Sequence, residues 1–355
     1  MKKSVLLLGG TGAMGNHLVQ ILKEKDFEVF VSSRSDRKSH DNVTYIKGNA
    51  HDDVFLESLL SQRNWDVIVD FMIYSSAEFS NRVDKLLKSC KQYVFLSSSR
   101  VYADSSEPIT ESSPRLLDVC TDKEYLKTDE YALSKARQEN LLISSCLKNW
   151  TIIRPYITFS DARLQLSCLE KEYWLKRVLN NKPIVFSKDL ANKTTTFTCG
   201  NDVAKGIAAI IGKKEALGEI FHITNNKSYK WADFLQVYTS ILEQYCGHKA
   251  SIIYVDKWSD YYSGKWQIIY DRLYDRTFDN SKINKFIDTS NFIDPKIALS
   301  DCLLKFLEQP TFKSLYWETE VKLDSLSGNW TSLSAFPGLK QKIKYFLARL
   351  GVYHC

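Results

Sequence analysis

Tyr131 and Lys135 are the two residues of this sequence whose types and spacing most clearly suggest catalysis. Four residues are about one turn of an α-helix, so the two side chains share a face if the segment is helical. A tyrosine hydroxyl is a poor acid or base at neutral pH, because its reference pKa is about 10. A neighbouring ammonium favours the phenolate and brings the hydroxyl closer to useful acid–base chemistry. Alone the pair is weak evidence, since this spacing is common on helix surfaces.

A run of three serines, Ser97–Ser99, follows an apolar segment that is expected to be a strand. A hydroxyl at that place can hydrogen-bond a substrate oxygen and stabilise charge that develops on it. Combined with Tyr131 and Lys135, it indicates hydride transfer at a carbinol carbon, with Tyr131 exchanging the hydroxyl proton. Lys135 would also hold the ribose of a nicotinamide cofactor.

A glycine-rich turn lies between the first expected strand and the first expected helix. Gly9, Gly12 and Gly15 occupy the three places of a dinucleotide-binding fingerprint, with Ala13 and Met14 inside the turn. The first glycine permits the tight turn, the second lets the backbone approach a pyrophosphate, and the third lets the helix pack on the strand. The helix N-terminus then offers N–H groups and a positive dipole end to the phosphates. We therefore expect a dinucleotide to bind here.

The second expected strand ends without the acidic residue that usually binds the ribose hydroxyls of NAD. Ser33 and Arg34 stand there instead, and Arg37 and Lys38 follow closely. Hydroxyls and a guanidinium suit a 2′-phosphate, so Ser33 and Arg34 favour NADP over NAD. The alternative is that these are solvated loop side chains. Asn49, after the third expected strand, is a candidate contact to the adenine.

The elements that would position these groups alternate between apolar strands and amphipathic helices. This alternation of strands and helices is typical of βαβ units and of an α/β fold with a doubly wound parallel sheet of the Rossmann type. The expected strands are Ser4–Leu8, Glu28–Ser32, Val43–Lys47, Val67–Phe71, Tyr93–Ser97 and Thr151–Ile153, and the expected helices are Asn16–Lys25, Val54–Ser61, Asn81–Cys90 and Glu130–Lys148. Strands that are apolar on both sides require helices on both faces of the sheet.

The rest of the chain has a looser pattern. We expect a dinucleotide-binding Rossmann core over residues 1–160 and a smaller, interwoven, mixed α/β substrate-binding part over 161–310, with core elements returning near 197–225. An aromatic-rich C-terminal extension covers 311–355. The elements expected here are strands at Pro183–Phe186 and Ile220–Ile223 and helices at Trp231–Leu242, Ile297–Leu307 and Lys340–Leu350. The last helix is basic and amphipathic.

Composition excludes several classes of protein. With 44% hydrophobic and 25% charged residues, the 355-residue chain has the composition of a globular protein and not of a disordered one. Its net charge of +6 does not by itself indicate that the protein binds nucleic acid.

The eight scattered cysteines form no C-x-x-C pair or zinc pattern, so we expect reduced thiols, no metal site and a cytoplasmic protein. The apolar start ends too early for a signal peptide, and no stretch approaches the roughly 18 apolar residues of a membrane span.

Taken in order, the motifs resemble those of the NAD-dependent epimerase/dehydratase family, the extended short-chain dehydrogenases. They are Gly-Gly-Thr-Gly-x-x-Gly at 9–15, Ser-Ser-Ser-x-Val-Tyr at 97–102, Tyr-x-x-x-Lys at 131–135, Arg154–Pro155, Asp202–Ala204 and Gly218–Ile223. The resemblance implies that Ser98 is the catalytic serine, with Tyr131 and Lys135, and that Pro155 adjoins the nicotinamide pocket. It also implies a nucleotide-linked sugar as substrate, NADP or NAD as cofactor, and a homodimer.

Departures from the family narrow the expected chemistry. Sugar 4,6-dehydratases of the family have Asp and Glu directly after the catalytic Ser or Thr, whereas this chain has Ser99 and Arg100. An arginine cannot titrate usefully, so water elimination is not expected. Bifunctional epimerase–reductases carry a cysteine at the position of Arg100, which is also missing here. What remains is redox chemistry at one carbon, by a 4-epimerase or a 4-ketoreductase. The segment Asp70–Ile73 is bulkier than the turn that usually follows the fourth strand.

Two non-catalytic interpretations stay open. Similar Rossmann cores occur in RNA-associated relatives without a complete Tyr/Lys pair, and the basic tail and eight tryptophans could support RNA or membrane contact. The second is an NADP-sensing regulator. The intact set of Ser98, Tyr131 and Lys135 argues against both, because binding alone does not require it. We therefore expect neither a nucleic-acid partner nor a membrane partner, and we interpret the basic C-terminal helix as a solvated face.

Overall fold

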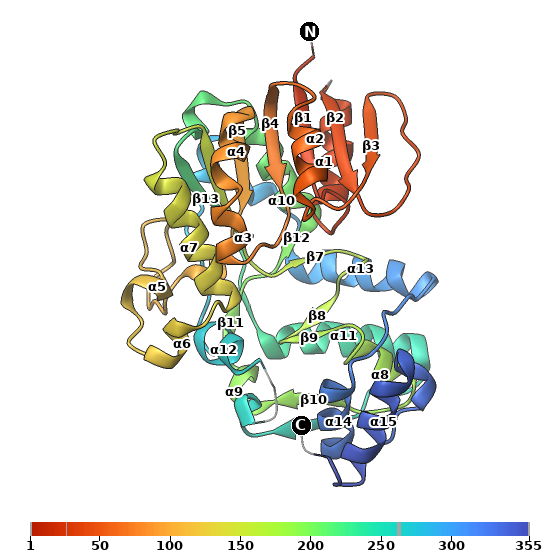
Figure 1. Cartoon of the computed structure of the whole chain (residues 1–355). Helices are drawn as coiled ribbons and strands as arrows, with labels where there is room; N and C mark the ends of the chain where they lie inside the picture. Colours follow the sequence, from red (N-terminus) through yellow and green to blue (C-terminus); the bar gives the residue numbers. More distant parts are fainter. Residues whose placement is uncertain (1, 26, 261–263, 354–355) are drawn as a thin grey trace. The chain divides into compact units, whose positions relative to one another are not determined.

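The computed structural model describes residues 2–25, 27–260 and 264–353. The chain divides into two compact units that alternate along the sequence (Figure 1). Unit 1 comprises Met1–Ser160, Thr196–Lys227 and Thr277–Pro295, and unit 2 comprises Asp161–Thr195, Ser228–Arg276 and Lys296–Cys355. The functional division at residues 160 and 310 that we infer from the sequence stays a prediction.

A parallel sheet forms the centre of unit 1. Among the described residues, seven strands pair in the order β13-β6-β5-β4-β1-β2-β3, and each pairing is parallel. The strands are β1 (Ser4–Leu8), β2 (Glu28–Ser33), β3 (Val43–Lys47), β4 (Trp65–Asp70), β5 (Cys90–Leu96), β6 (Trp150–Pro155) and β13 (Glu219–Ile223). The order runs outward from β1 in both directions, which confirms the doubly wound Rossmann-type fold predicted from the sequence.

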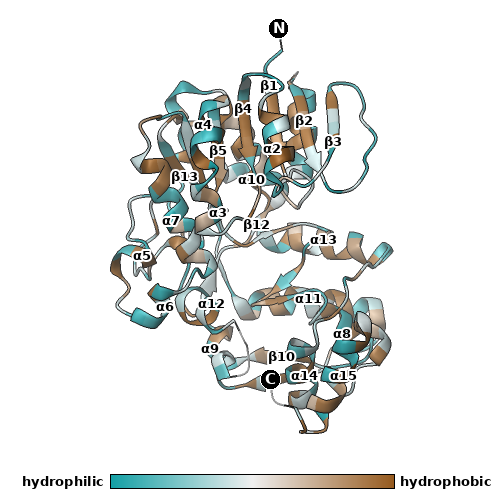
Figure 2. Ribbon diagram, in the orientation of Figure 1, coloured by the Kyte–Doolittle hydropathy of each residue, from teal (hydrophilic) through white to brown (hydrophobic). Residues whose placement is uncertain are grey.

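Helices cover both faces of this sheet. They are α1 (Gly15–Glu24), α2 (Asp53–Leu60), α3 (Ser76–Ser80), α4 (Val83–Lys88), α5 (Leu116–Val119), α6 (Lys123–Lys127), α7 (Tyr131–Ser144) and α10 (Gly200–Ile210). Successive residues of β1 point to opposite faces. Val5 and Leu7 therefore pack with α1 and α10, whereas Leu6 and Leu8 pack with α2 and α4. Both faces of the central strands are apolar, as the brown ribbons of β4 and β5 in Figure 2 illustrate.

The helix expected over Asn81–Cys90 is present but shorter than predicted. The helix of this segment is confined to Val83–Lys88, and Cys90 already begins β5, where it pairs with Trp65 of β4. The apolar residues of the segment serve both elements, and periodicity alone does not divide a short apolar run between a helix and a strand.

The helix expected to reach Lys148 ends at Ser144. The chain has to turn back there, because the parallel strand β6 begins at Trp150. The side-chain amide of Asn149 holds this turn by donating to the carbonyls of Leu87 (2.9 Å) and Cys90 (2.8 Å). The return to the sheet therefore limits the length of α7.

Unit 2 combines helices with short paired strands. The strand pairs are β8 (Gln165–Leu166) with β9 (Leu169–Glu170), β10 (Ile184–Ser187) with β15 (Ile252–Val255), and β11 (Thr194–Thr195) with β14 (Tyr229–Lys230). The helices are α8 (Leu175–Leu179), α9 (Lys188–Ala191), α11 (Trp231–Cys246), α12 (Lys265–Gln267), α13 (Pro295–Glu308), α14 (Trp317–Ser327) and α15 (Gly338–Arg349). In the part of the chain that the structure describes, no helix has the length and apolar character needed to cross a membrane.

Candidate active site

The expected site residues gather at one edge of the sheet. Gly9 follows β1, Ser33 ends β2, Asn49 lies after β3, Ser98 lies after β5 and Pro155 ends β6. These are the carboxyl ends of parallel strands, which meet at the same edge. Doubly wound sheets bind their ligands outside this edge. The fold therefore places the cofactor candidates and the catalytic candidates on one side of unit 1.

The glycine turn between β1 and α1 has open space beside its middle glycine. Gly9 has a φ of +67°, which glycine adopts without strain. A Cβ on Gly15 would lie 2.5 Å from the carbonyl of Gly10, so α1 packs tightly on the turn. A Cβ on Gly12, in contrast, would meet nothing within 4 Å. The N-terminus of α1 at Met14 has no side-chain cap, so its N–H groups suit an anionic ligand.

Ala13 and Met14 also contact the protein itself. A Cβ on Gly200, the first residue of α10, would lie 2.4 Å from the carbonyl oxygen of Ala13, so the turn and α10 touch through their backbones. The side chain of Met14 is half-buried and packs against the apolar core beneath α1. We did not predict a helix near this turn from the sequence, although the small residue Gly200, two residues before Asp202, was an available signal.

The end of β2 carries the residues expected to distinguish NADP from NAD. Ser33 is buried, and its hydroxyl donates to the carbonyl of Ser35 (2.9 Å) and accepts from its N–H (3.2 Å), so it braces the loop. Arg34 is exposed. The carboxylate of Asp36, further along the loop, forms an ion pair with Lys47. The strand thus ends beside an exposed guanidinium and a carboxylate that is already paired.

Asn49 and Pro155 occupy different surroundings. Asn49 is exposed, and its side-chain carbonyl accepts from the N–H of His51 at 3.2 Å. Pro155 is buried at the end of β6, in register with Ile223 of β13. Asn49 therefore offers a polar group to solvent, whereas Pro155 contributes a rigid backbone position in the sheet.

Lys135 is buried against the sheet, with only 1% of its surface exposed. Its ammonium lies 4.4 Å from the centroid of the Phe95 ring on β5 and 3.5 Å from the carbonyl oxygen of Met72, which follows β4. Burial lowers the pKa of Lys135 to about 8, because the charged form loses hydration, although the nearby carboxyl of Asp70 opposes this change. At neutral pH the group therefore still carries its proton most of the time, but it releases that proton more readily than an exposed lysine does.

Asp70 is a site residue that sequence reasoning missed. It is fully buried at the end of β4 and accepts hydrogen bonds from Tyr93 (2.8 Å), Tyr74 (3.1 Å) and the N–H of Met72 (2.9 Å). Burial raises the pKa of Asp70. These bonds fix the turn on which Lys135 rests. An acidic residue at the end of an apolar strand was the available signal, whereas the sequence analysis noted only the bulk of this turn.

Met72 joins the lysine to the glycine turn. Its carbonyl accepts from the Lys135 ammonium, and its Sδ atom would lie 2.8 Å from a Cβ on Gly9. One residue therefore contacts both halves of the expected site, and the buried ammonium lies near the glycine turn in space as well as at the same sheet edge.

Tyr131 and Ser98 both contact Arg100. Tyr131 begins α7, and the guanidinium carbon of Arg100 lies 5.2 Å from the centroid of its ring. Arg100 belongs to η1 (Ser99–Val101), the 3-10 turn that follows β5, and it forms an ion pair of 2.5 Å with Glu130. Ser98 caps the same turn by accepting from the N–H of Arg100 at 3.2 Å. Arg100 therefore contacts the phenol ring through its guanidinium and the serine hydroxyl through its backbone.

A buried ionic network fixes α7 relative to the sheet. Glu139 of α7 accepts from Arg154 of β6 (2.8 and 2.6 Å), from Ser97 (2.6 Å) and from Arg115 (3.1 Å). Glu139 and Arg154 are both buried, and a buried charge strongly disfavours arrangements in which it loses its partner. This network holds the helix that carries Tyr131 in one orientation at the end of β5.

The buried ammonium predicts a specific pH dependence of stability. The unfolded chain binds a proton at Lys135 up to about pH 10.5, whereas the folded protein releases it near pH 8. Stability should therefore rise with pH between these values, by about 3 kcal/mol in total. Lys135→Met lacks this contribution, so the free energy of unfolding of the wild type should rise relative to that of the variant over this window in urea titrations. Parallel curves would contradict the burial of the charge.

Comparisons with known proteins agree with this architecture. The model of the NAD dependent epimerase/dehydratase family matches residues 5–224. The chloroplast stem-loop binding protein of 41 kDa b from Arabidopsis thaliana is 26% identical over 241 residues, which are 64% of this chain and 60% of that protein. The uncharacterized UDP-glucose epimerase YtcB of Bacillus subtilis is 24% identical over 204 residues, 53% of this chain and 60% of that protein. The chain thus spans about three fifths of the length of these curated relatives.

Solved structures share the fold. The Bordetella bronchiseptica enzyme WbmH, in complex with NAD+, superposes with a TM-score of 0.67 at 16% identity, covering 88% of this chain and 100% of that one. UDP-glucuronic acid 4-epimerase from Bacillus cereus, in complex with UDP-glucuronic acid and NAD, gives a TM-score of 0.64 at 18% identity, covering 87% and 100%. Because the family model matches more than half of its residues, the chain belongs to the NAD-dependent epimerase/dehydratase family.

Proposed function

We propose that the protein is a nicotinamide-dinucleotide-dependent oxidoreductase that acts on a nucleotide-linked sugar. It transfers hydride at one carbinol or keto carbon, as a 4-epimerase or a 4-ketoreductase. The proposal rests above all on Lys135, whose ammonium is buried one turn after Tyr131 and beside Met72, the residue that also contacts the glycine turn. Solved relatives of this fold contain NAD and UDP-glucuronic acid, which supports both classes of ligand.

The glycine turn fits a dinucleotide. The open space beside Gly12 and the uncapped N-terminus of α1 suit a pyrophosphate. Ser33 and Arg34 would contact the adenosine ribose, and the lack of an acidic residue at the end of β2 favours a 2′-phosphate, hence NADP. Asn49 would contact the adenine and Pro155 would adjoin the nicotinamide. When bound, the nicotinamide ring supplies the hydride donor or acceptor.

Tyr131 is the residue that we propose moves the proton. As the phenol it gives a proton to the sugar oxygen during reduction, and as the phenolate it takes the proton of the sugar hydroxyl during oxidation. Lys135 follows one turn along the same helix, and the guanidinium carbon of Arg100 lies 5.2 Å from the centroid of the tyrosine ring. Because Arg100 is already paired with Glu130, we assign the main supporting role in the proton transfer to Lys135. A lysine with a pKa of about 8 can also pass a proton onward at neutral pH.

Ser98 is proposed to hold the reacting oxygen. Its Oγ atom accepts from the N–H of Arg100, which leaves its own proton to donate to a substrate oxygen. The side chains of the two residues that follow already bond to other residues of the protein. Ser99 donates to the carbonyl of Arg154 at 2.8 Å, and Arg100 pairs with Glu130. Neither can act as the acid or base that removes water from a sugar, so the proposal excludes dehydration.

An RNA-associated role without catalysis is the alternative. One observation favours it, the similarity to the chloroplast stem-loop binding protein of Arabidopsis thaliana. The buried ammonium argues against it, because removing a charge from water lowers stability and a binding protein gains nothing from that cost. We therefore retain hydride transfer as the function of the site.

Gly12→Val should fold like the wild type but bind NADPH at least about tenfold more weakly, because its side chain enters the space proposed for the pyrophosphate. Gly15→Val is the matched control. It should lose stability, since a Cβ there would lie 2.5 Å from the backbone of Gly10. Thermal unfolding and fluorescence titration with NADPH separate the two effects. Unchanged affinity in Gly12→Val would refute the assignment of the turn.

Tyr131→Phe should keep the fold and the affinity for NADPH but lose turnover by about 10²- to 10⁴-fold, because the proton-exchanging hydroxyl is absent. A panel of UDP- and dTDP-linked hexoses is the substrate set. NMR detects epimers, and the absorbance of reduced nicotinamide detects net reduction, so one assay distinguishes the epimerase from the ketoreductase. Tyr254→Phe, at an exposed tyrosine of unit 2, is the control. Undiminished turnover in Tyr131→Phe would rule out the mechanism.

Arg34→Ala should weaken NADPH binding by about tenfold or more and leave NADH binding nearly unchanged, because a charge-assisted contact to the 2′-phosphate is lost. Arg37→Ala removes the same charge from the same loop, where the guanidinium lies 5.8 Å from the Tyr45 ring centroid. It should have a much smaller effect. Fluorescence titrations measure both affinities, and equal losses for the two cofactors in Arg34→Ala would reverse the preference.

A further inference from the structure

The last helix, α15, exposes a row of large apolar side chains. Leu339 is 72% exposed, Ile343 49%, Phe346 44% and Leu350, at its C-terminal end, 55%. Their spacing of four, three and four residues places them along one side of the helix. We call these four residues the α15 apolar face. A row of large exposed apolar side chains on one helix is a candidate contact surface.

The opposite side of α15 faces the protein. Tyr345 is fully buried, and its hydroxyl donates to Asp324 of α14 (2.7 Å) and accepts from the N–H of Thr331 (2.6 Å). Its ring packs on Phe336, with centroids 4.5 Å apart. Because Tyr345 is held inward, the α15 apolar face is directed outward.

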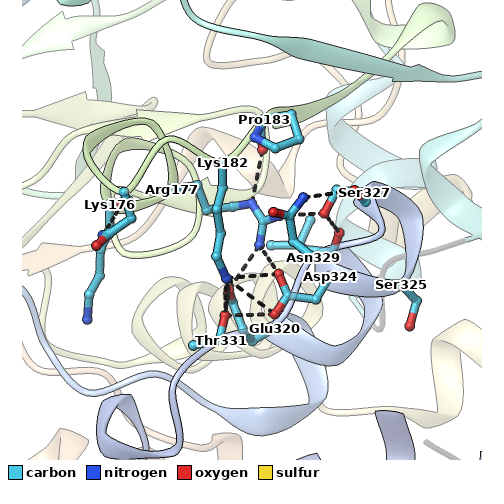
Figure 3. Close-up of polar contacts among 12 residues, drawn as sticks. Lys176, Arg177, Lys182, Pro183, Glu320, Asp324, Ser325, Ser327, Asn329 and Thr331 are labelled. Carbon is cyan, nitrogen blue, oxygen red and sulfur yellow. Dashed lines mark hydrogen bonds and ion pairs between the residues drawn. The ribbon is translucent and has the colours of Figure 1, made fainter. Parts of the chain in front are cut away.

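A buried ionic cluster around Arg177 holds α14 (Figure 3). Asp324 of this helix is also the residue that accepts from Tyr345. Arg177 of α8 donates to Asp324 (2.8 Å), Glu320 (2.9 Å) and Ser327 (2.7 Å). Lys182 adds a bond of 3.2 Å to Asp324. Buried charges of this kind keep their partners, because an unpaired charge in the interior is strongly disfavoured. The exposure of the α15 apolar face is therefore built into the packing of the extension.

Basic side chains border the α15 apolar face on both sides. By helical geometry, Lys340 lies along one border and Lys342 along the other. Lys344 lies farther round the helix, where its ammonium is 5.3 Å from the centroid of the Trp317 ring. The twelve residues of α15 include no Asp or Glu. Glu318 of α14 is an acidic neighbour, since it lines the same surface hollow as Lys340 and Lys344. The helix itself remains strongly cationic.

An exposed tryptophan extends this surface. Trp330 is about half exposed, and its ring centroid lies 6.2 Å from that of Phe346. The guanidinium of Arg349 covers part of it at 4.9 Å. Tryptophan is enriched at the boundary between lipid and water, where one part of the ring is apolar and its N–H remains hydrated.

We propose that α15 binds the surface of an anionic lipid bilayer. The α15 apolar face enters the headgroup region, and the bordering lysines lie at the level of the lipid phosphates, which is the arrangement of interfacial amphipathic helices. A second copy of this chain fits the surface less well, because a two-fold contact would bring the lysines of two α15 helices together. The inference replaces the sequence-based expectation of a solvated face without a membrane partner, and it is independent of the hydride-transfer chemistry.

Sedimentation of the full chain with vesicles tests this inference. The protein should bind vesicles of phosphatidylcholine with about one third phosphatidylglycerol, bind pure phosphatidylcholine vesicles at least about tenfold more weakly, and dissociate at high salt. The variant that combines Ile343→Ser and Phe346→Ser should lose binding by about tenfold or more. The matched control combines Ile297→Ser and Leu304→Ser, at residues of α13 that are 60% and 52% exposed, and should bind like the wild type.

Three results would overturn the proposal. One is no binding to the anionic vesicles, and another is equal binding by the α15 variant when circular dichroism shows that it is folded. The third is a wild-type protein that forms a dimer but binds no vesicles, together with an α15 variant that is monomeric. That result would assign the surface to a second copy of the chain.

Discussion

The burial of a single ammonium group, that of Lys135, is the interaction on which the site depends. Away from water, its charge is balanced by the carbonyl of Met72, the face of the Phe95 ring and the carboxyl of Asp70. These groups come from the ends of β4 and β5, so α7 has to pass over the carboxyl edge of the sheet. Tyr131, one turn earlier, is then placed at the same edge. Burial of a charged group lowers the stability of the folded protein, and such groups are characteristic of sites whose chemistry requires a shifted pKa.

Much of the fold follows from local pattern, because the strands of a doubly wound sheet are short, apolar and separated by helices. The boundaries of β1 and β3 agree with the sequence-based prediction, as does the glycine turn that follows β1. The spacing of Tyr131 and Lys135 also identifies a shared helical face. The helix α10 was not predicted, because its glycines and alanines give a weak apolar pattern, although Gly200 needs to be small to approach Ala13.

The parts that could not be predicted depend on contacts between distant segments. The sequence does not reveal that Met72 lies between Gly9 and Lys135, because that contact requires the order of the strands in the sheet. Likewise, the basic amphipathic character of α15 is evident from its residues, but the direction of its apolar face depends on the bond between Tyr345 and Asp324. The sequence pattern identifies such helices and strands, whereas the packing between them determines which side chains are exposed to a ligand or a surface.

The most direct test of the central claim is a crystal structure of the protein with bound NADPH. The account predicts that the ammonium of Lys135 lies about 3 Å from a hydroxyl of the nicotinamide ribose, with the pyrophosphate beside Gly12. A dinucleotide bound away from the glycine turn, or one whose ribose is out of hydrogen-bond reach of Lys135, would contradict it.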